Sequence, residues 1–319
     1  MPQVSVIIPN YNHAPYLKQR INSVLQQTYR DFELIILDDC SPDNSRDVIE
    51  QYRGHERVSH IVYNETNGGT TFKQWKKGIE LAAGQYIWIA ESDDWCEPTL
   101  LETLMTGLLN NPACVIAYAQ TYVVRGNSIE KVSTHHTLSE YVPGKEYILN
   151  YLVEECTIWN ASMAVFKKEN YFNTSQEFTT YKMSGDWLWY IEMAKQGDVF
   201  ISGRVLNYFR NHDKDVSGKM YRSGSSYKEE IRILHHLKDD GLISMELFKT
   251  MLLTKYIRSC VSRYKFDPNL VKEVNEAFYH GQSYRRFLRY NAWLFLMRAR
   301  IIRRMSEIIK AKDIYRLKN

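Results

Sequence analysis

The sequence lacks the features of several large protein classes. No uninterrupted apolar run among its 319 residues reaches the length of about 20 that a membrane-spanning helix needs. The first residues carry no basic segment and no small-residue cleavage site, and an apolar run begins at Val4, so we expect no signal peptide. These absences predict a cytoplasmic protein.

Cysteine is scarce and scattered. The five cysteines are odd in number and form no C-x-x-C pair: Cys40, Cys96, Cys114, Cys156 and Cys260. This pattern argues against a disulfide framework and against a zinc site, and it is typical of proteins from a reducing cytosol.

Two nucleotide-binding fingerprints are also missing. No G-x-G-x-x-G follows the first apolar run, which disfavours a dinucleotide-dependent dehydrogenase. No G-x-x-x-x-G-K-[ST] occurs, which disfavours a P-loop NTPase.

The sequence does contain a regular alternation of strands and helices in its first part. With 44% apolar and 24% charged residues it resembles an ordinary globular protein, long enough for one large domain and an appendage. Buried strands are predicted at 4–9, 32–37, 58–63 and 86–89, with amphipathic helices between them. Strands that alternate with helices predict an α/β fold with a mainly parallel sheet.

The later part of the chain is less regular. A helix after Pro98 and a strand at 114–124 are predicted, and then the alternation fades from 125 to 215, apart from an apolar stretch at 158–166 and a helix at 186–195. From about residue 227 the pattern is helical to the end. We therefore expect domains at 1–215 and 216–319.

Two of the predicted strands end in acidic residues. Asp38 and Asp39 follow one strand, and Glu91, Asp93 and Asp94 follow another. The carboxyl ends of parallel strands meet at one edge of the sheet, where ligands bind. One such pair is weak evidence because aspartate often caps helices, but two pairs with a glycine-containing loop between them favour a nucleotide-diphosphate site.

Five segments of the first half stand in a recognisable register: residues 4–12, 26–29, 32–45, 67–69 and 83–87. Together they resemble glycosyltransferase family 2. The resemblance implies the GT-A fold, a Rossmann-like nucleotide-sugar half over 1–125 joined to an acceptor-binding half over 126–215. The Q-x-x-R-W motif and membrane helices of the processive branch are absent, so the non-processive, inverting type is expected.

The resemblance also assigns roles to single residues. The predicted nucleotide-sugar contacts are Pro9, Tyr11, Asp39, Asn67, Gly68, Ser92 and Asp93, with Asp39 accepting from a uracil N–H. Mn²⁺ or Mg²⁺ is expected at Asp93, Asp94 and His212. Glu91 stands where the family has an aspartate on the ribose side.

Asp186 falls where the family places its catalytic base. The chemistry needs one carboxylate to take the proton of the attacking hydroxyl. The residues alone leave a second role open, because Asp186 follows Gly185 and could cap the helix. His212 could instead be a surface-loop histidine, which is the commoner case. We interpret His135 and His136, with no further metal-binding residue nearby, as loop.

The last segment is strongly basic. Residues 284–319 carry eleven Lys or Arg against two acids, a net charge of +9 in a chain of +4, which leaves −5 on residues 1–283. Apolar residues alternate with these charges, which is typical of helices at a membrane surface. A helix packed on the protein with a solvated basic face would give the same pattern. No nucleic-acid recognition motif accompanies the charge, so we expect no nucleic-acid partner.

The sequence therefore predicts a metal-dependent inverting glycosyltransferase. Its donor would be a nucleotide-sugar, a UDP-sugar by the assignment of Asp39, and its acceptor a glycan or lipid-linked glycan in surface polysaccharide synthesis. It would be cytoplasmic or peripheral on the inner face of the membrane. The alternatives are a nucleotidyltransferase that makes nucleotide sugars and a catalytically silent nucleotide-sugar-binding partner.

Overall fold

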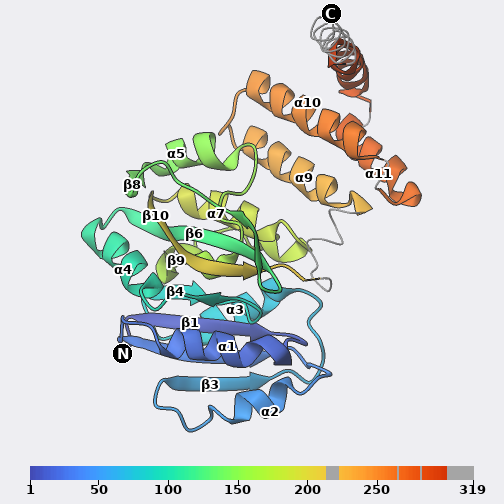
Figure 1. Cartoon of the computed structure of the whole chain (residues 1–319). Coiled ribbons are helices and arrows are strands. Elements are labelled where there is room, and N and C mark those ends of the chain that lie inside the picture. The colour runs from blue at the N-terminus through green and yellow to red at the C-terminus, as the bar shows by residue number, and fades with distance from the viewer. Residues whose placement is uncertain (213–222, 264–265, 281, 300–319) are drawn as a thin grey trace, which may run out of the picture. The chain divides into compact units, whose positions relative to one another are not determined.

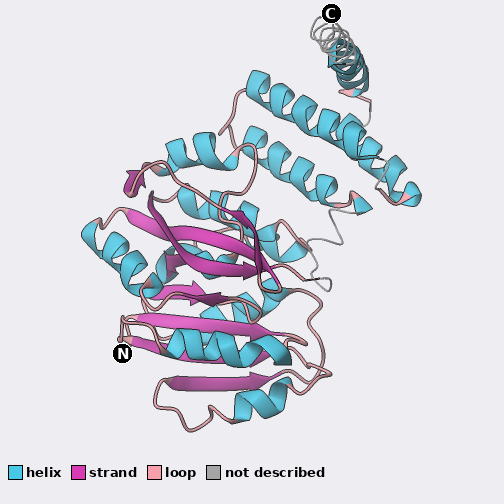
Figure 2. Ribbon diagram, in the orientation of Figure 1, coloured by secondary structure: helices cyan, strands magenta, loops and turns pink. Residues whose placement is uncertain are grey.

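The computed structural model describes residues 1–212, 223–263, 266–280 and 282–299. The chain divides into two compact units, Met1–Asp215 and Val216–Asn319, which is also where the sequence predicts a division. The first unit contains the sheet, and the second is helical in its described part (Figures 1 and 2).

The first unit begins with the predicted alternation of strands and helices. The elements are β1 (Val4–Asn10), α1 (Ala14–Leu25), β2 (Phe32–Asp38), α2 (Ser45–Glu50), β3 (Val58–Tyr63), α3 (Thr71–Leu81) and β4 (Tyr86–Ile89). The four strands are parallel in the order β3-β2-β1-β4. This confirms the predicted α/β class.

The sheet continues through the second part of the unit, where pairing is mixed. It contains β5 (Trp95–Cys96), α4 (Leu100–Asn110), β6 (Cys114–Arg125), β7 (Ser128–Val132), β8 (Ser139–Val142), α5 (Gly144–Tyr147), the π-helical η1 (Ile148–Leu152), the 3₁₀ turn η2 (Ala161–Met163), β9 (Ala164–Lys167), α6 (Lys168–Tyr171), the 3₁₀ turn η3 (Gln176–Thr180), α7 (Gly185–Ala194) and β10 (Asp198–Arg210). Strand order runs on as β4-β9-β6-β10-β5, with β9 antiparallel to both neighbours and β10 parallel to β6. The sequence pattern did not predict β7, β8 or β10.

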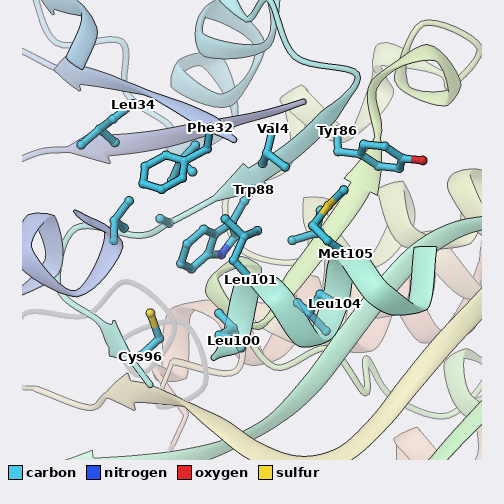
Figure 3. Close-up of a cluster of buried hydrophobic side chains, with 14 of the residues drawn as sticks. Val4, Phe32, Leu34, Tyr86, Trp88, Cys96, Leu100, Leu101, Leu104 and Met105 are labelled. Atoms are coloured by element: carbon cyan, nitrogen blue, oxygen red, sulfur yellow. The ribbon is translucent and has the colours of Figure 1, made fainter. Parts of the chain in front are cut away.

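Apolar side chains cover both faces of the sheet. On one face, residues of β1, β2 and β4 pack with α1, α2 and α4 around the fully buried Trp88 (Figure 3). On the other face α3 lies so close to β1 that a Cβ on Gly78 would stand 2.4 Å from Ile7 Cγ2. Close packing of this kind fixes the strands, and therefore the loops at their carboxyl ends.

The parallel register aligns three of those loops. Asn10 at the end of β1 pairs with Asp38 at the end of β2, and its side-chain amide donates to the Asp38 carboxylate at 2.7 Å. The Ala90 N–H, just beyond β4, donates to the Ile7 carbonyl at 2.8 Å. Residues that follow β1, β2 and β4 therefore lie at one edge of the sheet.

The second unit contains α9 (Ser226–Asp239), α10 (Met245–Ser262) and α11 (Pro268–Tyr279), and residues 285–299 are also helical. A largely buried ion pair, Lys255 Nζ to Glu230 Oε2 at 2.8 Å, joins α10 to α9. In the part of the chain that the structure describes, we find no helix that is both long and apolar enough to span a bilayer.

Candidate active site

Asp94, which the sequence assigns to a metal, is turned into the protein. Its carboxylate accepts from Ser162 Oγ at 2.7 Å, from the Arg210 N–H at 2.9 Å and from the side chain of Asn160. The guanidinium of Arg20 lies 3.8 Å away, and Asp94 is 1% exposed. These partners give the carboxylate a structural role, and the structure does not bring Asp94 into the three-residue cluster that could hold a metal ion.

The neighbouring Asp93 meets two histidines. Its Oδ2 lies 3.0 Å from His212 Nε2 and 4.0 Å from His13 Nε2. The ligating atoms of the three residues all lie within 4.8 Å of one another. The structure thus brings together two residues that the sequence assigns to a metal, Asp93 and His212, and adds His13, which sequence reasoning missed. Its position in the loop after β1 is the signal that could have identified it.

Polar contacts orient this cluster. His13 Nδ1 lies 2.9 Å from Ser92 Oγ, which directs Nε2 of the same ring towards Asp93. The His212 ring stacks on Tyr16, with ring centroids 5.5 Å apart. Burial would raise the pKa of Asp93, but the His212 hydrogen bond and the nearby His13 outweigh it and lower that pKa below its usual value.

Arg210 joins the acidic turn, residues 91–94 after β4, to the end of β10. Its Nε donates to the Asp93 carbonyl at 2.7 Å, and its Nη2 donates to Gln19 on α1 at 2.8 Å. The guanidinium carbon lies 4.5 Å from the ring of Tyr16 and 4.4 Å from that of Trp95. This packing fixes the strand two residues before His212.

Glu91 is held by the core rather than by the cluster. Trp75 Nε1 donates to its carboxylate at 2.8 Å. Burial and then the charge of Asp93 raise its pKa to about 8. A carboxyl group in this position is available as a hydrogen-bond donor near neutral pH, which an aspartate of ordinary pKa would not be.

Asp39 forms a second polar group at the same edge. Its Oδ1 accepts from Asn64 Nδ2 at 2.6 Å, from the Gly68 N–H at 2.9 Å and from Gln74 Nε2 at 2.7 Å. Asn67 Nδ2 donates to the Asp39 carbonyl at 3.1 Å. The structure therefore brings Asp39, Asn67 and Gly68 together, as the resemblance implies.

The remaining predicted contacts lie on β1 and just beyond it. Pro9 is buried within the strand, and Tyr11 is 48% exposed directly after it. A hollow of about 510 Å³ opens next to the histidines and is lined by residues 12–16, Asp43, Asn44 and His212. Two members of the cluster, His13 and His212, line this hollow, whereas none of the predicted donor contacts does.

Asp186 is the second residue of α7 and is half-buried. Ser184 is the N-cap residue, so Asp186 is not the N-cap itself, although its Oδ1 accepts from the Trp187 N–H in the first turn of the helix at 2.8 Å. Gly185 allows the helix to begin here, because a Cβ at this position would stand 2.4 Å from the Phe178 carbonyl oxygen. Burial, and then the charges of Asp186, Cys156 and Glu91, raise the pKa of Tyr190, so Asp186 and Glu91 both lie within electrostatic reach of one tyrosine.

We predict that Asp93 and Asp94 differ in how much they contribute to the stability of the fold. Asp94→Asn should lower the free energy of unfolding by about 3 kcal/mol, because an amide would face donors and leave Arg20 unpaired. Asp93→Asn should cost about 1 kcal/mol or less, since it removes one hydrogen bond at a half-buried position.

Urea unfolding followed by tryptophan fluorescence measures this difference, because six of the seven tryptophans lie in the first unit. Equal losses in the two variants, or a larger loss for Asp93→Asn, would contradict the assignment.

Comparison with known proteins gives relatives of one kind. A protein named as the teichuronic acid biosynthesis glycosyltransferase TuaG of Bacillus subtilis is 36% identical over 117 residues, 37% of this chain and 46% of TuaG. Glycosyltransferase GlyG of Streptococcus pneumoniae serotype 4 is 29% identical over 149 residues, 47% of this chain and 46% of GlyG. An uncharacterized glycosyltransferase of Haemophilus influenzae is 31% identical over 175 residues, 54% of this chain and 70% of the relative. The chain thus spans less than half the length of TuaG and of GlyG.

Solved structures share the fold. The S. aureus TarS fragment 1–349 in complex with UDP-GlcNAc has a TM-score of 0.60 at 17% identity, covering 89% of this chain and 92% of that one. The mannosyltransferase PcManGT from Pyrobaculum calidifontis, in complex with GDP-Man and Mn²⁺, has a TM-score of 0.55 at 15% identity, covering 92% and 85%. These likenesses confirm the predicted GT-A fold.

The family model described as Glycosyl transferase family 2 matches residues 5–184. This match covers more than half of the chain and includes β1, β2, β4 and the acidic turn. The chain therefore belongs to glycosyltransferase family 2.

Proposed function

We propose that this protein is a glycosyltransferase that moves one sugar from a UDP-linked donor to a hydroxyl of a glycan or lipid-linked glycan, with inversion at the anomeric carbon. The observation that carries the proposal is the convergence of His13, Asp93 and His212 beside the Asp39 group at one edge of the sheet. A nucleoside diphosphate presents a flat base and an anionic diphosphate, and these two groups of side chains match its two ends.

The Asp39 group would bind the base. Oδ1 of Asp39 accepts three hydrogen bonds, whereas Oδ2 accepts from Gly68 alone among the described contacts, at 3.0 Å. Oδ2 can therefore accept a further hydrogen bond, and the ring N–H of uracil is a suitable donor. Tyr11, half-exposed after β1, would lie against the base. TarS, which shares the fold, was solved with UDP-GlcNAc.

The histidine cluster would hold the metal. Two imidazoles and one carboxylate, with donor atoms within 4.8 Å of one another, suit Mn²⁺, and PcManGT was solved with that ion. When bound, the ion neutralises charge on the leaving diphosphate. The protein's part is orientation: Ser92 fixes the His13 ring, and Arg210 fixes the backbone of Asp93.

Asp186 would be the general base. The acceptor oxygen attacks the anomeric carbon from the face opposite the diphosphate, the sugar–phosphate bond breaks, and the hydroxyl proton passes to the Asp186 carboxylate. The buried aromatic helix α7 holds this carboxylate rigidly, because Trp187, Leu188 and Trp189 are each at most 5% exposed. One carboxylate is enough for a single displacement with inversion.

The acceptor class rests on the relatives. TuaG carries teichuronic acid biosynthesis in its name, so a surface polysaccharide or its lipid-linked precursor is the acceptor that we propose.

Calorimetric titration of UDP, GDP and dTDP tests the donor site. We expect one nucleotide, UDP, to bind in Mn²⁺ and to bind at least about tenfold more weakly in EDTA. Asp93→Asn in Mn²⁺ should behave like the native protein in EDTA, whereas the control Asp47→Asn, an exposed acid on α2, should not. Binding of none of the three by folded protein would overturn the proposal.

Substitution of the base tests the chemistry separately. Asp186→Asn should lower kcat by about 10³-fold with nucleotide affinity unchanged, because only proton removal is lost. The matched control Glu169→Gln, an exposed acid in α6, should retain full activity. If Asp186→Asn kept more than a tenth of native kcat, measured by release of nucleoside diphosphate, another group would be the base.

We also propose that the C-terminal helix binds anionic membrane surfaces. Its described part exposes Tyr290, Trp293 and Phe295, each more than half accessible, beside the exposed arginines 285, 286, 289 and 298. Exposed aromatics and arginines together suit the headgroup region of a bilayer. The predicted basic residues from 300 to 319 lie outside the described residues.

Sedimentation with phosphatidylserine vesicles tests membrane binding. The protein should sediment with the vesicles at low salt and be released at about 0.5 M salt, because screening weakens the attraction. It should not bind neutral vesicles. Trp293→Ala should weaken binding several-fold, whereas Phe172→Ala, an equally exposed aromatic on the first unit, should not. Equal binding to neutral and anionic vesicles would contradict the electrostatic part.

A further inference from the structure

A second group of side chains that could hold a metal ion lies where the connection from β7 enters β8. His135 Nε2 is 2.9 Å from Glu140 Oε2, and the rings of His135 and His136 have centroids 4.6 Å apart. The ligating atoms of all three residues lie within 4.8 Å of one another. The two histidines lie in a loop, as interpreted, but the expectation that no further metal-binding residue lies nearby is wrong, because the fold places Glu140 beside them.

The surrounding structure holds two of these side chains in place. The Tyr151 hydroxyl donates to Glu140 Oε2 at 3.4 Å, and the Tyr151 ring lies 6.2 Å from that of His135. Tyr151 in turn stacks on Tyr147, which is fully buried. The His135 side chain is only 5% exposed. Preorganised ligands with an outer hydrogen-bond partner are typical of metal sites.

Both ends of the connection are anchored to the sheet. The Ser133 N–H donates to the Thr121 carbonyl of β6 at 2.9 Å, and the Thr121 N–H donates to Ser133 Oγ at 2.8 Å. Ser139 and Glu140 pair with Ser202 and Ile201 of β10. The histidines therefore span a short gap between fixed points, and the exposed His136 can turn towards an ion at little cost.

We propose that His135, His136 and Glu140 bind Zn²⁺ or a similar divalent transition metal. Two imidazoles and one carboxylate are a known zinc ligand set, with a fourth position for water. In tetrahedral zinc sites the ligating atoms lie roughly 3.4 Å apart, so adjustments of about 1 Å or less would close this cluster. An ion pair between His135 and Glu140 accounts for those two residues but leaves the placement of His136 unexplained.

The site shares no residue with the cluster at Asp93 and does not depend on the proposed function. It lies in the half of the domain that the sequence assigns to the acceptor. A bound ion would link the β7–β8 connection to β10 through Glu140, so its role would be to fix that connection in one conformation.

Zinc binding to the full chain, measured by competition with a chromogenic chelator, tests the proposal. The native protein and Asp93→Asn are compared because the cluster at Asp93 can also take the ion. In both proteins we expect a zinc site, and adding His136→Gln should lower the affinity of that site for zinc at least about tenfold. Co²⁺ should give a visible absorption band that the same substitution removes.

The control is His60→Gln, which removes a histidine on β3 outside the three-residue groups of the described chain. It should leave zinc affinity unchanged. His136 is exposed, so thermal melting should show that His136→Gln is folded, and Glu140→Gln gives a second variant. Zinc affinity and stoichiometry unchanged in both His136→Gln and Glu140→Gln would overturn the proposal, as would an equal loss in His60→Gln.

Discussion

The buried guanidinium of Arg20 is the interaction on which the site depends. It donates from Nε to the Glu91 carbonyl at 2.8 Å and from Nη2 to Ser162 Oγ at 2.7 Å, and it lies 3.8 Å from the Asp94 carboxylate. A fully buried charge persists only when it is paired, because an isolated one would cost several kcal/mol. Arg20 thus ties α1, the acidic turn and η2 together, and this leaves Asp93 to face the histidines.

Local sequence patterns were enough to predict the first half of the fold. Continuous apolar runs gave β1 to β4, and a parallel sheet necessarily brings Asp39 and the acidic turn to one edge. Patterns could not separate Asp93 from Asp94, because adjacent carboxylates have the same local signal. Their roles differ only through distant partners, His212 for one and Ser162 for the other.

The same limit explains the missed elements of the second half. Strand β10 pairs with β6 through register shifts near Ile201 and Val205, so its apolar residues follow no strict period of two. Glu140 lies only five residues after His135, where the pairing of β8 with β10 holds it. The cluster at Asp93 is instead assembled from afar, because His13 meets residues 80 and 199 positions later. Contacts of this kind cannot be predicted from the spacing of residues along the chain.

This long-range assembly also shows why the family match alone does not define the site. The match ends at residue 184, before Asp186 and before His212. His212 reaches Asp93 because β10 runs parallel to β6 and because Arg210 bonds to Asp93 and Asp94 through its side chain and its backbone N–H. Neither the cluster nor Asp186, the proposed base, therefore lies within the matched segment, and the chemistry that we propose for the acidic turn depends on the second half of the domain.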